Sequence, residues 1–66
     1  MNDWVKVYQT SDRISVEMVK LALEKNQIEA VCLNKQDSSY LFGNIEIYVP
    51  KSKFQSAIEI VISHDL

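Results

Sequence analysis

The sequence predicts an α+β fold in which a three-stranded sheet carries two helices on one face. Apolar and polar residues alternate in three short runs, which is the pattern of half-buried strands. Two other stretches repeat apolar residues at intervals of three and four, as a helix with one buried side does. The order along the 66 residues is strand, helix, strand, strand, helix. We expect residues 1–66 to form a single domain.

The first strand and helix are predicted in residues 4–25. Residues 4–9 alternate as a strand does. Thr10, Ser11 and Asp12 have the side-chain oxygens that cap a helix start, so a helix is predicted to follow and to end near Lys25. We expect Asn26 to terminate it in the left-handed conformation. The residues expected on its buried face are Ile14, Met18, Val19, Leu21 and Ala22.

The second half of the chain is predicted to hold two strands and one helix. Residues 28–33 and 45–49 alternate as strands, and Pro50 ends the second of these runs. Ser52 and Gln55 match a capping box at a helix start. The apolar stripe that follows consists of Phe54, Ala57, Ile58, Val61 and Ile62.

These elements are expected to pack as a two-layer ferredoxin-like sandwich that lacks its last strand. We expect the first strand and helix to cross over to a parallel neighbour, the third strand, and the second strand to pair antiparallel with the third. The first strand is then an open edge, which can pair with another chain. The sheet face beneath the helices is expected to hold Val5, Val7, Ile45, Ile47 and Val49.

Composition excludes several classes of protein. Cys32 is the only cysteine and His64 the only histidine, so we expect no internal disulfide, no metal site and no cofactor. The net charge of −2 is spread along the chain, which makes nucleic acid an improbable partner. Neither a membrane span nor a signal sequence is visible, so we expect a cytoplasmic protein. Because so short a chain builds only a small core, self-association, with a homodimer favoured, is expected to help stabilise it.

The loop at residues 34–44 is the first candidate site, because a hairpin needs only two linking residues. Its charge, amides and hydroxyls could bind a small polar ligand or a partner. Alternatively, these groups satisfy their own backbone in turns. The candidate binding residues are Asn34, Lys35, Gln36, Asp37, Ser38, Ser39 and Tyr40.

The sheet face opposite the helices is the second candidate site. Alternation is expected to place Cys32 there, together with four residues of an interaction surface. An exposed aromatic patch usually marks an interface with protein. Stacking of RNA bases is the weaker alternative, because the face mixes both signs of charge. The four interface residues are Trp4, Lys6, Tyr8 and Tyr48.

Nearly the whole chain resembles a family of small bacterial proteins of unknown function, described as putative prokaryotic signal-transducing proteins. The resemblance is strongest in residues 33–40, Gly43 and residues 45–50, and it extends to residues 4–12 and 17–28. It implies a ferredoxin-like fold related to the PII-type nitrogen regulators, in which the corresponding loop contacts partners. It brings no established ligand and no catalytic residues.

Two functions follow from these expectations. The first is a non-catalytic binding or signal-transducing module that acts as a homo-oligomer through residues 34–44 and the open sheet face. The alternative is a sensor that holds a metabolite or nucleotide between the two. No nucleophile paired with a base, and no pair of carboxylates in a supporting context, is visible, so we do not expect an enzyme.

Overall fold

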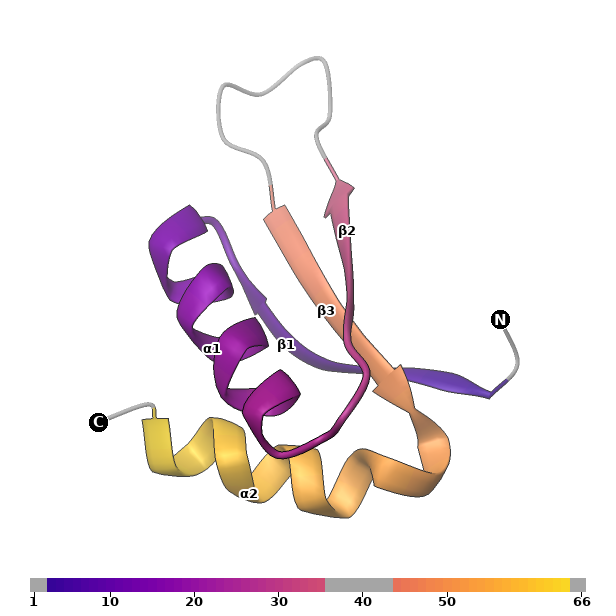
Figure 1. Ribbon diagram of the computed structural model, residues 1–66. Coiled ribbons are helices and arrows are strands. Elements are labelled where there is room, and N and C mark those ends of the chain that lie inside the picture. Colours follow the sequence, from indigo (N-terminus) through magenta and orange to yellow (C-terminus); the bar gives the residue numbers. More distant parts are fainter. Residues whose placement is uncertain (1–2, 36–43, 65–66) are drawn as a thin grey trace.

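The computed structural model describes residues 3–35 and 44–64 (Figure 1). The predicted order and α+β class are confirmed, and the arrangement is that of a ferredoxin-like sandwich. A short 3₁₀ turn, η1, precedes the last helix. The elements are β1 (Trp4–Thr10), α1 (Arg13–Lys25), β2 (Val31–Lys35), β3 (Asn44–Pro50), η1 (Lys51–Lys53) and α2 (Phe54–His64).

The sheet has the strand order β1-β3-β2, and β3 is antiparallel to both neighbours. β1 and β2 therefore run parallel to each other on either side of β3. The prediction that the third strand lies parallel to the first is wrong. The helical crossover joins β1 to β2, and β3 returns between them, because a hairpin connection makes consecutive strands antiparallel. β1 is at an edge of this sheet, as predicted.

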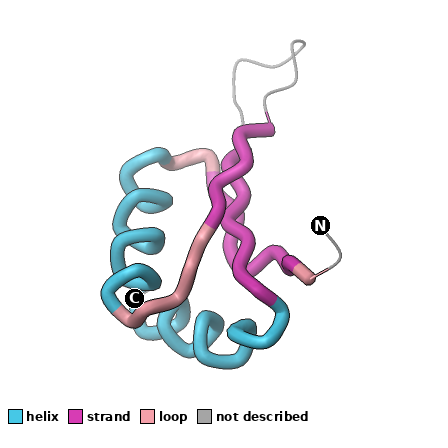
Figure 2. The backbone as a smooth tube through the Cα atoms, turned by 45° about the vertical axis from the view of Figure 1, so that its right-hand side comes forward, coloured by secondary structure: helices cyan, strands magenta, loops and turns pink. Residues whose placement is uncertain are grey.

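Both helices pack on the same side of the sheet (Figure 2). Between the two layers lies one apolar cluster, in which Leu23, Ile47 and Val49 are fully buried. These three side chains come from α1 and β3, so the central strand carries much of the core. The buried members of the cluster are Val7, Val16, Val19, Leu23, Ile28, Ile47, Val49, Ala57 and Val61.

The helix α1 presents a different face to the sheet from the one predicted. Val19 and Ala22 are buried as expected, but Ile14, Met18 and Leu21 are 67%, 57% and 54% exposed. Apolar residues occur on opposite sides of this helix at the same helical spacing, so periodicity alone could not choose between them. The side that packs on the sheet consists of Val16, Val19, Ala22 and Leu23.

The helix α2 begins two residues after Ser52, which lies in η1, so the capping box predicts the start too early. Ala57 and Val61 are buried, in agreement with the predicted stripe. Phe54 and Ile62, at its ends, are instead 38% and 64% exposed. The central part of the stripe therefore faces the core, and its ends are exposed.

The ends of α1 are fixed by local hydrogen bonds. Asp12 is the N-cap, as predicted, and its carboxylate accepts from the amide of Ile14 at 3.1 Å. At the other end Gln27, not Asn26, has the positive φ, 62°. The amides of Gln27 and Ile28 donate to the carbonyls of Glu24 and Leu23, which is a Schellman motif. β2 then begins at Val31, three residues later than predicted.

Candidate functional site

The second face of the sheet, on the side away from the helices, is defined by cross-strand pairs. Lys6 and Val31 flank Tyr48, and these three lie on the opposite side from the buried Ile47 and Val49. Within the described residues, neither helix packs on this side. We call this surface the open face; it consists of Trp4, Lys6, Gln9, Val31, Leu33, Glu46 and Tyr48.

A bulge in β1 changes which residues reach the open face. The pairing with β3 shifts between Lys6 and Tyr8, so Val7 is the extra residue. Beyond it Tyr8 pairs with Ile47 and packs against the core, and the prediction of Tyr8 on the open face is therefore wrong. Gln9 takes the expected place of Tyr8. Nothing in the alternation of residues 4–9 signals the bulge, so Gln9 was missed.

Cys32 also lies on the helix side of the sheet, contrary to prediction. It pairs with the fully buried Ile47, is half-buried, and packs against the core cluster. Strand β2 starts later than predicted, and its register with β3 places Val31 and Leu33 on the open face instead. Both are partly buried apolar residues of an edge strand.

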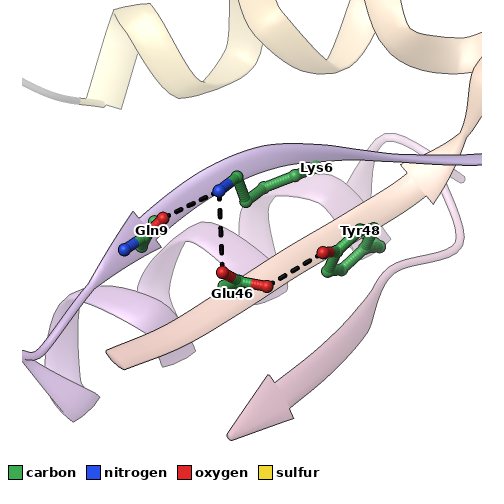
Figure 3. Close-up of polar contacts among 4 residues, drawn as sticks. All are labelled: Lys6, Gln9, Glu46 and Tyr48. Atoms are coloured by element: carbon green, nitrogen blue, oxygen red, sulfur yellow. Dashed lines mark hydrogen bonds and ion pairs between the residues drawn. The ribbon is translucent and has the colours of Figure 1, made fainter. Parts of the chain in front are cut away.

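A polar cluster of four residues occupies the open face (Figure 3). The carboxylate of Glu46, a residue only 7% exposed, lies between a cation from β1 and a phenol from its own strand. Lys6 Nζ is 3.6 Å from Glu46 Oε2, and Tyr48 Oη donates to Glu46 Oε1 at 2.9 Å. Lys6 Nζ also donates to Gln9 Oε1 at 2.9 Å. These contacts link β1 to β3 across the sheet.

Lys6 and Tyr48 compensate the negative charge of the buried Glu46 carboxylate. A carboxylate this deeply buried would be costly without a counter-charge and donors, and here Lys6 and Tyr48 supply them. The hydrogen bond to Glu46 raises the pKa of Tyr48 above 10.0, with smaller contributions from burial and from the negative charge of Glu46. The phenol therefore keeps its proton near neutral pH and can donate it in the hydrogen bond to Glu46. The Lys6 side chain remains 45% exposed.

Two of the predicted loop residues lie at the end of β2, and Asn44 begins β3. Asn34 is exposed and pairs with Ile45, which places it on the helix side rather than on the open face. Lys35 pairs with Asn44. The other candidates, Gln36, Asp37, Ser38, Ser39 and Tyr40, lie outside the described residues. The strands that carry the loop therefore place its base at one end of the sheet.

A concave region, absent from the sequence predictions, lies between α1 and the sheet. Its volume is about 240 Å³, and Arg13 and Lys20 of α1 line it together with Asn34 and Cys32 of β2. The side chains offer cationic and amide donors beside a thiol. Their convergence depends on the crossover from β1 to β2, so no local sequence signal indicates it.

Two searches of the described part of the chain gave negative results. Between residues 3–35 and 44–64, no three metal-binding side chains of His, Cys, Asp or Glu come together. None of the helices seen in these ranges has the length and apolar character to cross a membrane.

Comparison with known proteins places this chain in a family. The model of the family described as putative prokaryotic signal transducing protein matches residues 4–64, which include every helix and strand of the fold. Comparisons with curated proteins and with solved structures found no match. The family description names signal transduction and no reaction. The chain therefore belongs to the family of putative prokaryotic signal transducing proteins.

Proposed function

We propose that this protein is a non-catalytic, cytoplasmic signal-transducing module that binds a partner protein through its open face and acts as a homo-oligomer. The observation that carries the proposal is the open face itself. It holds the half-buried aromatic side chains of Trp4 and Tyr48 around the ion pair of Lys6 with Glu46. A signalling module needs such a recognition surface, and the family description supports this class of function.

The composition of the open face fits a protein partner best. Aromatic residues beside a cation are typical of protein interfaces. Val31 and Leu33 extend the apolar part of the surface along β2. Single-stranded RNA fits less well, because the most buried group of the face is the carboxylate of Glu46, which repels phosphate. We propose that residues 34–44, carried at one end of the same sheet, widen this surface.

Affinity capture from the native host tests the proposal. The tagged wild-type protein should retain one or more specific proteins, and Trp4→Ala should lose them. Phe54→Ala is the matched control, because Phe54 is an aromatic residue 38% exposed on the helix side. Circular dichroism establishes that both variants are folded. Equal capture by the wild type and Trp4→Ala would contradict the assignment of the open face.

The alternative function, a small-molecule sensor, is supported by the concave region near Arg13, Lys20 and Asn34. These donors suit an anionic metabolite, although about 240 Å³ is small for a ligand site. A ligand that binds only the folded state raises the melting temperature. We expect a thermal-shift screen of nucleotides and organic anions to find no compound that raises the melting temperature if the protein-binding function is correct. A hit lost in Arg13→Ala would favour the sensor.

A further inference from the structure

We propose that a second copy of this chain docks on the exposed side of α1, with the two helices antiparallel. This inference rests on the self-association included in the proposed function and specifies its surface. Three apolar residues form that surface: Ile14, Met18 and Leu21 are 67%, 57% and 54% exposed. Their spacing of four and then three residues is the apolar seam of a helix that packs on another helix. We call these three residues the α1 stripe.

A row of charges beside the α1 stripe indicates what covers it. Arg13, Glu17, Lys20 and Glu24 follow the same spacing one residue earlier, so they line one flank of the stripe. Their signs alternate as plus, minus, plus, minus. Among the described residues, none of the four makes an ion pair within the monomer. Three are exposed and Lys20 is partly buried; Arg13, Glu17 and Lys20 also line the concave region between α1 and the sheet, so the row follows the side of the stripe that is nearer to β2.

This row is complementary to its own copy only when the two helices run in opposite directions. A two-fold axis that passes between residues 18 and 19 brings this flank of one helix beside the same flank of the other. Arg13 then lies level with Glu24 of the second copy, and Glu17 with Lys20. A parallel two-fold arrangement would instead place this flank beside the opposite flank of the second copy, so the row would not meet itself. Charge complementarity of this kind determines the orientation of paired helices.

The same axis interleaves the apolar residues. Met18 lies at the axis and meets Met18 of the second copy. Residues at equal distances on either side of the axis lie level with each other. Ile14 of one helix therefore lies at the height midway between Leu21 and Lys25 of the other. Leu21 likewise falls between Met18 and Ile14. A single position of the axis therefore satisfies both the charges and the packing, which is the requirement for a specific interface.

The edge of β1 is the competing route to a dimer, and the structure disfavours it. The bulge at Val7 interrupts the regular edge, and Lys6 adds a charge; both features discourage strand addition. A dimer formed through α1 has a further consequence. The stripe faces away from the sheet, so the open face stays free on both copies for the partner protein.

Sedimentation equilibrium of the full chain, from micromolar to millimolar concentration, tests this proposal. The wild type should reversibly form a species of twice 7.6 kDa. Met18→Lys, which places like charges at the axis, should weaken association at least about tenfold. Ile62→Lys is the control, because Ile62 is 64% exposed on α2, and it should associate like the wild type. Circular dichroism verifies that each variant is folded.

A charge exchange tests the orientation. Glu17→Lys should weaken association about three- to tenfold, because surface ion pairs are individually weak and the substitution alters two symmetry-related pairs. The double variant Glu17→Lys with Lys20→Glu should recover it, because antiparallel helices remain complementary. The same charge change at the exposed Glu29, outside the helices, should have no effect.

Three results would overturn the proposal. A wild type that stays monomeric to millimolar concentration removes self-association from the proposed function as well. A dimer that survives Met18→Lys refutes only the α1 surface. Failure of the double variant to recover association refutes the antiparallel arrangement. If the monomer instead co-sediments with anionic lipid vesicles through Met18, the stripe is a membrane contact and the proposal is wrong.

Discussion

At the scale of single residues, the turn after α1 contains the least favourable backbone conformation described. Gln27 has a φ of 62°, where a side chain with a Cβ is disfavoured. The amides of Gln27 and Ile28 nevertheless close the Schellman motif, and Leu23 and Ile28 are both buried beside it. The apolar contact and the two hydrogen bonds therefore hold Gln27 in a conformation that glycine adopts more readily.

Replacing Gln27 with glycine should stabilise the protein. Relief of the left-handed conformation outweighs the greater entropy of unfolded glycine, so we expect a gain of a few tenths to about 1 kcal/mol in the free energy of unfolding. Urea denaturation measures the change. Asn26→Gly is the matched control and should destabilise, because Asn26 has a φ of −97° and its side chain donates to the carbonyl of Ala22. A Gln27→Gly variant less stable than the wild type would contradict this interpretation.

The helix cap at Asp12 should make stability depend on acid pH. The hydroxyl of Ser15 and the amide of Ile14 lower the pKa of Asp12 below its ordinary 3.8. A pKa lowered by folding means that the carboxylate stabilises the native state above pH 3.8 and loses this effect as the pH falls through the folded value. Asp12→Asn keeps an acceptor that does not titrate.

The difference in unfolding free energy between the wild type and Asp12→Asn should therefore shrink as acid is added. Urea denaturation at a series of pH values between neutral and strongly acid measures it. A difference that stays constant across this range would show that the carboxylate of Asp12 has the same pKa in the folded and unfolded states.

At the scale of elements, the sequence predicts where α1 begins and ends but not which side it buries. The N-terminal cap is local, since Asp12 and the two groups that donate hydrogen bonds to it lie within three residues, and so a sequence pattern can find it. The buried side depends on where the chain goes next. Leu23 must meet Ile28 across the Schellman turn, and this contact turns Val16 and Val19 towards the sheet. The remaining apolar residues are left on the outer side.

Alanine substitutions on the two sides of α1 test this orientation. Leu23→Ala removes a fully buried side chain and should cost about 2–5 kcal/mol. Leu21→Ala, at a residue 54% exposed, should change the stability of the dilute monomer by less than about 0.5 kcal/mol. Urea denaturation of the two single variants provides a matched comparison. Equal losses of stability would contradict this orientation of α1.

At the scale of the whole molecule, fold class and element order follow from the sequence, whereas the direction of pairing and the register do not. Side-chain patterns locate strands but contain no information on which neighbours they choose. The antiparallel position of β3 and the bulge at Val7 arise from connections and twist. The bulge exchanges Tyr8 for Gln9, and the register of β2 with β3 places Cys32 on the helix side, so the residues of the open face were predicted only in part.

The molecule thus has two exposed surfaces of different chemistry on opposite sides of one small core. The open face combines Trp4 and Tyr48 with the ion pair of Glu46, and we propose that it binds a partner protein. The α1 stripe is apolar and is flanked by self-complementary charges, and we propose that it binds a second copy. Because the two surfaces are separate, a dimer formed through the α1 stripe could still bind a partner protein on the open face of each copy.

The most direct test of the central claim is site-specific photocrosslinking in the native host. A photoreactive phenylalanine analogue at Trp4 places the probe on the open face, and the same analogue at Phe54 is the control on the helix side. We predict that the Trp4 probe captures a specific protein other than this chain and that the Phe54 probe does not. Identical products from both positions, or only a second copy of this chain from Trp4, would contradict the assignment of the open face as the recognition surface.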